Sequence, residues 1–286
     1  MASSRRRYAA QLKPNTLGLW GDGLKQLDDY YRKHHIAAEE FACSYAADCS
    51  RGATDFVEAR EPLVGDLYEK RVLPRLLIVS LDPATDMVGR DPQHRRAGAV
   101  LEWEARQPRP VNGGPEFKKQ AHWYQTYEFA HRLLAPIARE RGVGTISFSQ
   151  MYRYFAHTNS AKCKDTGVGT AQAAARIFQN CSHFIPGEVV ALEPDIVVTQ
   201  GKYARESIAS LPVLLSASTA SGKYHADVVD LSGRPAIRFE THHPNRKDNS
   251  YRNEVAEAWS WYAKIAAAFS SGGNAALTRD FGFTKP

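Results

Sequence analysis

Short runs of consecutive apolar residues, separated by helix-like segments, constrain the fold of this chain most strongly. The clearest runs are Leu76–Leu81, Asp195–Thr199 and Pro235–Phe239. Their length and β-branched content are typical of strands buried on both faces of a parallel sheet. A fourth strand region is expected over Tyr152–Ala156, with Thr145–Phe148 beside it. The alternation with helices predicts an α/β fold, a single three-layer α/β/α domain with a central, mostly parallel, four-stranded sheet.

Helices are expected between and around these strands. Apolar spacing predicts long helices over 15–49, 121–141, 170–191 and 251–269, and short ones near 97–106 and over 202–210. Residues 55–70 fit either a helix or an irregular connection, and 84–118 are expected to form long loops. No linker rich in Pro, Gly or Ser divides the chain, so 15–286 is predicted to be one domain that follows a basic tail, 1–14.

The charge of the chain bears on its partners and location. The formal net charge of the 286 residues is +6. This excess fits an ordinary basic soluble protein, or one that binds nucleic acid through clustered Lys and Arg. The basic segment Met1–Arg7 is not followed by an apolar stretch, so it does not read as a secretory signal. No run of about 18 apolar residues is present, and we expect a cytoplasmic monomer without a membrane span.

Polar residues follow three of the predicted strands. These are Asp82-Pro83, His157–Asn159 and the segment from His242 to Asn245. The carboxyl ends of parallel strands meet at one edge of a sheet, so these residues are expected to converge. A carboxylate, an amide and an imidazole in one crevice can act as a base, read a polar ligand edge and stabilise a departing anion. Polar loops also begin at strand ends for no catalytic reason, and convergence is what favours a site.

The four cysteines of the chain form a second candidate site. Cys43 and Cys49 are separated by five residues, and Cys163 and Cys181 by seventeen. In a cytosolic chain such cysteines are not expected to form structural disulfides. Four thiolates suit a tetrahedral zinc ion or a [4Fe–4S] cluster, and free cysteines are also common in cores. The spacing alone leaves zinc, cluster and unrelated buried thiols open.

The segment around Cys163 resembles the iron–sulfur uracil-DNA glycosylases. That family has an N-x-x-K-C segment, a later helix with another Cys, a strand and turn rich in apolar residues, and a late His-Pro pair. The matching parts are Asn159–Cys163, Cys181, Glu193–Ala204 and His243-Pro244, and Cys43 and Cys49 precede the first strand as in the family. The resemblance covers about 43–250. It implies a uracil-DNA glycosylase-like fold and a [4Fe–4S] cluster on the four cysteines, where it staples loops that meet DNA.

The first active-site segment departs from the iron–sulfur branch. The first cysteine pair is more widely spaced than is usual, and Ser80–Thr85 looks more like the G-Q-D-P-Y-H motif of cluster-free uracil-DNA glycosylases. On this match Asp82 positions or activates water. Ala84 replaces a tyrosine that excludes substituents on pyrimidine C5, and Leu81 replaces a polar residue, so the pocket is expected to be enlarged. The aromatic that stacks on the base has three candidates, Trp103, Trp123 and Tyr124.

The resemblance implies a monofunctional DNA glycosylase that leaves an abasic site. Asp82 would stabilise the sugar cation and orient water, and His243 would bond the pyrimidine O2 as negative charge develops. His242 is not expected to do this, because the family pattern has His directly before Pro. Asn159 would read the base edge, with Pro83 and Ala84 beside it, while Asn245, Arg246 and Lys247 would contact DNA.

Two substrates and a second class of function remain open at this point. The substrate is either uracil or a related deaminated base, or a bulky 5-substituted pyrimidine such as the modified cytosines of some phage genomes. The latter would make the protein a defence enzyme. The alternative class is a non-catalytic nucleic-acid-binding module stapled by a four-cysteine metal site. A metal-dependent hydrolase built on His242 and His243 is less favoured, because adjacent histidines lack the usual i, i+4 ligand spacing.

Overall fold

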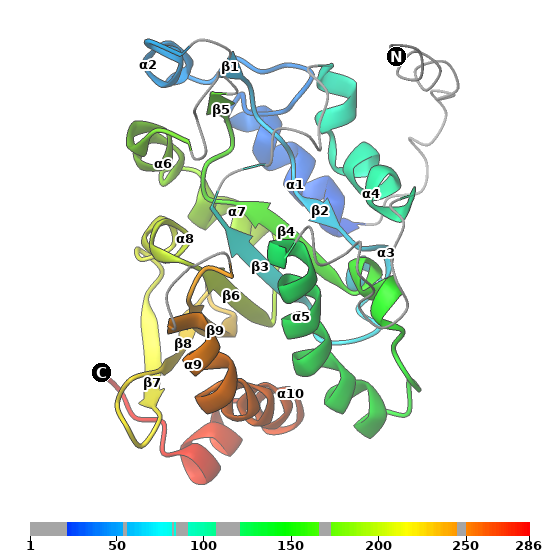
Figure 1. The fold of residues 1–286 in the computed structure, drawn as a ribbon, viewed down its shortest axis with the longest axis vertical. Coiled ribbons are helices and arrows are strands. Elements are labelled where there is room, and N and C mark those ends of the chain that lie inside the picture. The colour runs from blue at the N-terminus through cyan, green and yellow to red at the C-terminus, as the bar shows by residue number, and fades with distance from the viewer. Residues whose placement is uncertain are drawn as a thin grey trace.

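The computed structural model describes residues 22–53, 56–81, 83, 91–106, 121–165, 173–244 and 250–286. The predicted basic tail, 1–14, lies outside the described residues. Within these ranges, no helix has the length and apolar character needed to cross a membrane. The fold is α/β with a mixed sheet (Figure 1).

The central sheet has seven strands in the order β2-β4-β3-β6-β9-β8-β7. The four-stranded, mostly parallel sheet expected from the sequence is therefore wrong in its strand number. A second, two-stranded sheet pairs β1 with β5. The strands are β1 (Phe56–Val57), β2 (Leu63–Val64), β3 (Leu76–Ser80), β4 (Phe155–Asn159), β5 (Lys164–Asp165), β6 (Ile196–Gln200), β7 (Val213–Ser218), β8 (His225–Asp230) and β9 (Pro235–Thr241).

The middle of the large sheet is parallel. β3 pairs in parallel with both β4 and β6, and β6 pairs in parallel with β9. β2 is antiparallel at one edge, and β8 and β7 are antiparallel at the other. The three apolar runs predicted to be buried strands are confirmed, because every residue of β3 and β6 and most of β9 is buried.

Helices cover both faces of the sheet, as expected for a three-layer arrangement. The even-numbered β3 residues Leu76 and Ile78 pack into one core with α5 (Ala121–Glu140) and α10 (Trp259–Phe281). The alternate residues Leu77 and Val79 pack into a second core with α1 (Asp22–Lys33), α7 (Ile185–Leu192) and α8 (Lys202–Ser207). Successive side chains of a strand point to opposite faces, which explains this division.

Several predicted elements differ from those observed. The helix expected over 15–49 is two helices, α1 and α2 (Ala46–Ser50), joined by turns that include His35 with a φ of 55°. The expected 170–191 helix is divided into α6 (Ala175–Cys181) and α7, and Pro186 stands in the first turn of α7. Residues 55–70 hold β1, β2 and α3 (Asp66–Glu69). The strand expected over 145–148 is wrong, since a 3₁₀ helix, η4 (Phe148–Arg153), begins there.

The remaining helices lie close to their predicted positions. α4 (Ala97–Arg106), α5 and α8 confirm the helices expected near 97–106, over 121–141 and over 202–210. The expected 251–269 helix is observed as α9 (Ser250–Glu257) and the longer α10, and a further 3₁₀ helix, η2, spans Pro92–Arg95.

Candidate active site and cysteine pocket

The carboxyl ends of the parallel strands align at one edge of the sheet. Ser80 at the end of β3 is the register partner of Asn159 at the end of β4, and Gln200 at the end of β6 is the partner of Thr241 at the end of β9. Asn159 is 4% exposed. It is the last residue of β4, because the observed strand begins at Phe155, three residues after the expected start at Tyr152.

Gly201 brings the ends of β3, β6 and β9 together. Its φ of +95° lies in a region that side chains rarely adopt, and a Cβ there would stand 3.1 Å from Cβ of His243 and 3.5 Å from Cδ2 of Leu81. A glycine is therefore required at this close approach. His243 and Leu81, which are far apart in the sequence, lie on either side of Gly201. The segments that follow β3 and β9 therefore approach each other at these two residues.

A chain of hydrogen bonds runs beneath this edge. The Nε2 of His157 lies 2.8 Å from Oγ of Ser80, and Ser80 Oγ donates to Oε1 of Gln200 at 2.6 Å. The Nε2 of Gln200 donates to Oγ1 of Thr126 on α5 at 3.1 Å, and Thr126 donates to the carbonyl oxygen of His122 at 3.0 Å. These bonds fix the ends of β3 and β6 against the start of α5.

His122 is a functional candidate that the sequence analysis did not single out. Its ring is stacked on that of His243, with centroids 5.0 Å apart and planes 11° from parallel. Burial is the main reason why the pKa of His122 is lowered to about 3, and the nearby His243 adds to the effect. A hydrogen bond with Gln200 partly opposes this shift. The ring is therefore neutral at physiological pH. A lone histidine on an amphipathic helix carries no sequence signal for such a role.

The candidate stacking aromatics fall in different surroundings. Trp123 lies edge-on to His157, with ring centroids 4.7 Å apart, and its plane is 5° from that of His122. Tyr124 instead packs against Phe148. Trp103 lies on α4. Of the three, Trp123 is the one whose described ring contacts include residues of the strand-end site.

Glu254 of α9 holds the segment after β9. Its Oε2 accepts a hydrogen bond from the backbone N–H of His242 at 2.7 Å. Burial raises the pKa of Glu254 to about 8. The carboxyl group is thus a structural support for the residue that precedes His243.

Several predicted site residues lie outside the described residues. They are Asp82, Ala84, Asn245, Arg246 and Lys247. Their described neighbours Leu81, Pro83 and Pro244 flank the strand ends, and Pro83 and Pro244 are buried.

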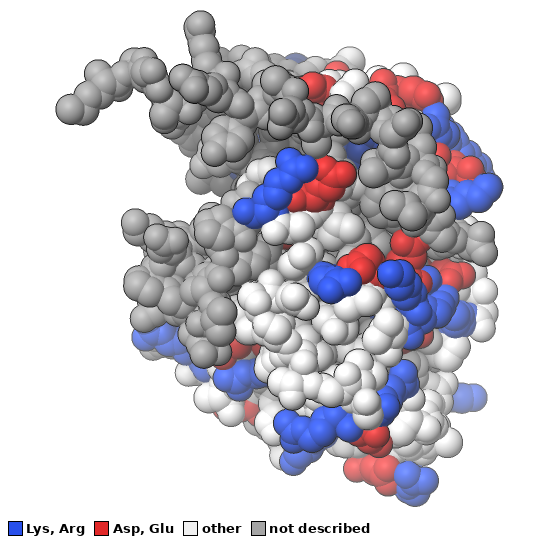
Figure 2. Space-filling model, turned by 90° about the vertical axis from the view of Figure 1, so that its right-hand side faces the viewer, with Lys and Arg blue, Asp and Glu red and all other residues white. Residues whose placement is uncertain are grey.

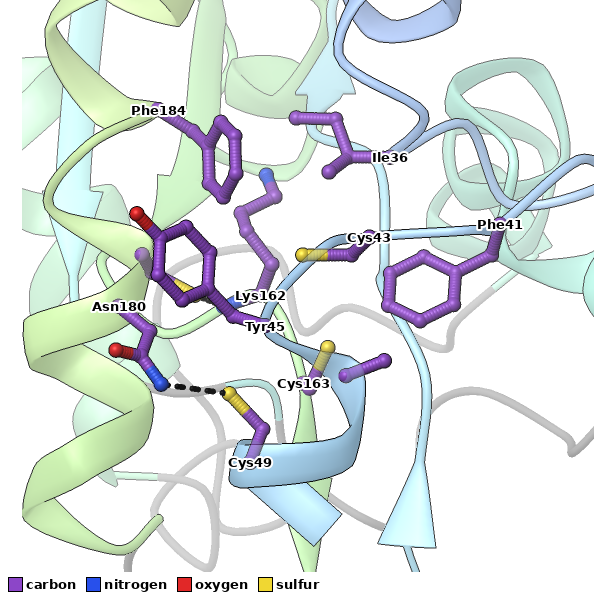
Figure 3. Close-up of a pocket in the computed structure, with 11 residues that line it drawn as sticks. Ile36, Phe41, Cys43, Tyr45, Cys49, Lys162, Cys163, Asn180 and Phe184 are labelled. Atoms are coloured by element: carbon purple, nitrogen blue, oxygen red, sulfur yellow. Dashed lines mark hydrogen bonds between the residues drawn. The ribbon is translucent and has the colours of Figure 1, made fainter.

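The four cysteines line a single pocket (Figure 3). Figure 3 shows Cys43, Cys49 and Cys163 with their sulfur atoms directed into the same space. The cysteines come from the segment after α1, from α2, from the segment after β4 and from the end of α6. The structure therefore brings together two pairs that are more than a hundred residues apart in the sequence.

The thiols of this pocket interact with one another. Burial raises the pKa of Cys163 well above its ordinary value, and the nearby Cys181, Cys49 and Cys43 add to the rise. Burial likewise raises the pKa of Cys181 to about 12. Four thiolates in one buried pocket repel each other unless a cationic group balances them. Binding of such a group would release protons from the thiols.

Two N–H groups point at the cysteine sulfurs. The backbone N–H of Lys162 donates to Sγ of Cys181 at 3.3 Å, and Nδ2 of Asn180 donates to Sγ of Cys49 at 3.4 Å. Hydrogen bonds to ligand sulfurs are a means by which proteins stabilise and tune iron–sulfur clusters. The donor set of the pocket thus fits a thiolate-bound metal group.

The described thiols do not form a ready-made site for one small ion. A zinc ion needs its sulfur ligands about 2.3 Å away. Among the described residues, no three His, Cys, Asp or Glu side chains are close enough to hold a single metal ion. The shared pocket nevertheless brings together four thiols of the kind that bind a metal group.

A buried ion pair lies against the cysteine pocket. The Nζ of Lys162 lies 3.0 Å from Oε1 of Glu188, with the two side chains 2% and 0% exposed, and also donates to Oγ1 of Thr158 at 2.9 Å. The ammonium stands 5.3 Å from the ring centre of Tyr31. Since Lys162 lines the pocket and Thr158 precedes Asn159 on β4, this network joins the cysteine pocket to the strand-end site.

The surface charge is mixed on the face drawn in Figure 2. Lys and Arg side chains there lie beside Asp and Glu and surround an uncharged area. Among the described residues, ion pairs within single helices include Arg132 with Glu128 at 2.9 Å on α5 and Arg106 with Glu102 at 3.1 Å on α4. Nothing in the described part of this face favours it for binding DNA.

Comparisons with known proteins add no family assignment. No protein-family model matches the chain, and no curated protein sequence matches it.

Proposed function

We propose that this protein is a monofunctional DNA glycosylase that hydrolyses the N-glycosidic bond of an altered pyrimidine and leaves an abasic site. One observation carries the proposal: Asn159, the last residue of β4, and His243, which follows β9, lie at the same edge of the sheet, beside a buried network of polar side chains. Ligands of α/β proteins bind at this edge. The parallel order β4-β3-β6-β9 in the middle of the sheet supports a uracil-DNA glycosylase-like core within the larger sheet.

The proposed chemistry divides the developing charges between two residues. As the glycosidic bond breaks, the sugar becomes cationic and the leaving pyrimidine anionic. Asp82, which directly follows Leu81 in the sequence, stabilises the cation and orients the attacking water. His243 donates a hydrogen bond toward O2 of the leaving base. The stacking of His243 on the ring of His122 supports this role, because it restricts the direction of the imidazole.

The base is held by groups near the ends of β3 and β4. Asn159 reads the Watson–Crick edge of a flipped base with its side-chain amide, which can both donate and accept hydrogen bonds. Pro83 and Ala84 line the side of the base, where the methyl group of Ala84 leaves room for a substituent on C5. A bulky 5-substituted pyrimidine, such as a modified cytosine of phage DNA, is therefore the substrate class we favour over unmodified uracil.

The proposed partner is DNA, bound by a cytoplasmic monomer. Asn245, Arg246 and Lys247 follow His243-Pro244 in the sequence, which would set two cations next to the flipped nucleotide. Phosphate contacts of this kind position the protein and do not read sequence. They offset the cost of removing the base from the duplex.

The cysteine pocket is proposed to hold a [4Fe–4S] cluster on Cys43, Cys49, Cys163 and Cys181. The support is the shared pocket of the four thiols and the two N–H groups that donate to their sulfurs. When bound, the group would supply a covalent staple between segments before β1 and after β4. The catalytic steps are assigned to the residues of the strand-end site alone.

Base release from labelled oligonucleotides tests the proposal. The panel holds uracil, thymine mismatches, 5-hydroxymethylcytosine and its glucosylated form, in single and double strands, and is read by alkaline cleavage at abasic sites. We expect cleavage at one base. It should be lost in Asp82→Asn and His243→Ala, and retained in His242→Ala, a substitution beside the proposed catalytic residue. DNA binding without any cleavage would instead favour a non-catalytic binding module.

A further inference from the structure

Gln200, the last residue of β6, lies at the centre of the buried hydrogen-bond network beside the strand ends. Its side chain is 1% exposed. The amide oxygen Oε1 accepts a hydrogen bond from Oγ of Ser80 at 2.6 Å, and the amide nitrogen Nε2 donates to Oγ1 of Thr126 at 3.1 Å. Gln200 therefore joins the end of β3 to the first part of α5 through two bonds of opposite direction.

The first of these bonds holds the strand that leads to Asp82. Only Leu81 separates Ser80 from Asp82 in the sequence. The hydroxyl group of Ser80, which is bonded to Gln200 of β6, also lies 2.8 Å from Nε2 of His157 on β4. Ser80 is thus held by side chains of both neighbouring strands, and this fixes the point from which the Asp82 segment leaves the sheet.

The second bond leads to His243. Thr126, which accepts from Gln200, donates to the carbonyl oxygen of His122 at 3.0 Å. The ring of His122 is stacked on that of His243, with centroids 5.0 Å apart. In addition, Gly201 directly follows Gln200, and a Cβ on Gly201 would stand 3.1 Å from Cβ of His243. His243 therefore contacts both the residue after Gln200 and the helical turn that the Gln200 amide holds.

We propose that Gln200 is a positioning residue, which holds His243 and the strand end before Asp82 in a fixed relation through the two ends of its amide group. This inference rests on the proposed glycosylase function. The proposed hydrolysis needs one group at the sugar and another at the leaving base in the same transition state. A displacement of about 1 Å in either group can lower the rate by about 100-fold.

Two variants interrupt the network, and a third is a matched control. Gln200→Met keeps a long unbranched side chain and removes both hydrogen bonds. Thr126→Val keeps the shape of the side chain and removes the link to the carbonyl oxygen of His122. Thr199→Val makes the same chemical change at the neighbour of Gln200 on β6, where the buried hydroxyl donates instead to the carbonyl oxygen of Phe239 at 3.5 Å.

The first readout is the pair of carbon-bound ring protons of His243, observed by NMR in protein with labelled histidines and assigned with His243→Ala. The stacked ring of His122 shifts these signals through its ring current. In Gln200→Met and Thr126→Val, the signals should move toward those of an unstacked histidine. In Thr199→Val they should stay at the wild-type positions.

His131 serves as an internal reference in the same spectra. It lies on α5 like His122, but its Nε2 is 3.3 Å from the carbonyl oxygen of Ile146, away from the strand ends. Unmoved signals of His131 in a variant would show that the helix as a whole is retained. Changes at His243 would then report a local loss of position.

The second readout is the single-turnover rate of release of the base that the wild-type protein removes. Gln200→Met and Thr126→Val should each lower this rate by about 10- to 100-fold, while the dissociation constant for the same DNA stays unchanged. Thr199→Val should keep the wild-type rate. A residue that only stabilises the fold would lower the fraction of active protein and leave the rate of the folded protein unchanged.

The outcomes separate the role of Gln200 from the proposed function. Unmoved His243 signals in the two network variants, or a loss of rate that Thr199→Val shares, overturn the role of Gln200 and leave the glycosylase function standing. Thr126→Val decides the matter if Gln200→Met does not fold. Absence of base release by the wild-type protein from every oligonucleotide overturns the glycosylase function, and the catalytic meaning of the Gln200 network fails with it.

Discussion

The imidazole ring of His122 lies nearly parallel to that of His243, with 5.0 Å between their centroids. The contact joins the first turn of α5 to the segment after β9, two parts of the chain that are more than a hundred residues apart. Two stacked imidazoles are not easily protonated together, because like charges repel. His122, which is held neutral by burial, thus provides an uncharged platform for the proposed catalytic histidine.

Acidification is expected to destabilise the protein through its buried histidines. Burial lowers the pKa of His122 to about 3 and that of His157 well below its ordinary value. Unfolding restores a pKa of about 6.5, so below that pH the unfolded state binds more protons than the folded state. The histidine contribution to stability is present above pH 6.5 and is lost as the pH falls toward 3. In urea unfolding, the free energy of unfolding of His157→Gln should fall less between pH 6.5 and 5 than that of the wild type or of His131→Gln.

The opposite pH dependence is expected from Glu254. Burial raises the pKa of its carboxyl group from 4.5 to about 8. The folded state therefore binds the extra proton between these values, and its stability falls as the pH rises from about 4.5 to 8. Replacement by Gln keeps an oxygen for the N–H of His242 and removes the titration. In Glu254→Gln, the decline in unfolding free energy between pH 6.5 and 8 should be smaller; an unchanged decline would show that Glu254 does not cause it.

Substitution of Gly201 should impair activity more than its effect on stability explains. In Gly201→Ala the new Cβ would stand 3.1 Å from Cβ of His243, in a backbone conformation with a φ of +95°. Strain of this kind costs about 1–3 kcal/mol. Gly222→Ala is the matched control, since its φ is +67° and nothing lies within 4 Å. Both variants should unfold at lower urea concentrations, but base release should fall only in Gly201→Ala. Equal base release by the two variants would mean that the position of His243 does not affect the reaction.

Removal of one partner of the buried Lys162–Glu188 pair should be strongly destabilising. The charged atoms lie 3.0 Å apart, and neither side chain is appreciably exposed. A buried charge that loses its partner typically costs about 3–5 kcal/mol. Lys162→Met and Glu188→Gln should each show this loss, and the double variant should be less destabilised than the sum of the two. Additive losses would mean that the two groups do not stabilise each other.

The four cysteines should act as one unit. Because all four line the same pocket, each Cys→Ser variant should lose most of the iron, the brown colour and the visible absorbance of the purified protein. The proposed cluster would also link distant segments of the chain, so iron removal by a chelator should lower the melting temperature. A colourless wild-type protein with stoichiometric zinc, or a serine variant that keeps full iron content, would contradict the cluster assignment.

The parallel middle of the sheet was predictable because its strands are continuous apolar runs. Such apolar runs are stable only in a sheet that is covered on both faces, as observed for Leu76–Ser80 and Ile196–Gln200. β7 and β8 were missed, since they contain Ser, His and Asp, and no residue of β7 and only three residues of β8 are buried. β2 has two residues and leaves almost no pattern. Such strands owe their existence to pairing partners distant in sequence, which local pattern does not reveal.

Residues of the candidate site were predictable only where a chemically suitable side chain lies at or after the end of a predicted strand. Asn159 and His243 follow from their places after apolar runs, and the cysteine pairs from their residue type. The hydrogen bonds of Ser80 and Gln200, and the stack on His122, arise from how α5 packs against the sheet. Those contacts depend on tertiary packing, and the spacing along α5 indicates only an amphipathic helix.

The most direct test of the account is mass-spectrometric identification of the free base released from DNA in a single turnover. The wild-type protein, at excess over a duplex that contains glucosylated 5-hydroxymethylcytosine or uracil, should release an intact pyrimidine in equal amount to the abasic sites formed. Asp82→Asn should lower the rate by several orders of magnitude without weakening DNA binding. Strand breaks without free base, or equal release by wild type and Asp82→Asn, would contradict the proposed hydrolysis of the N-glycosidic bond.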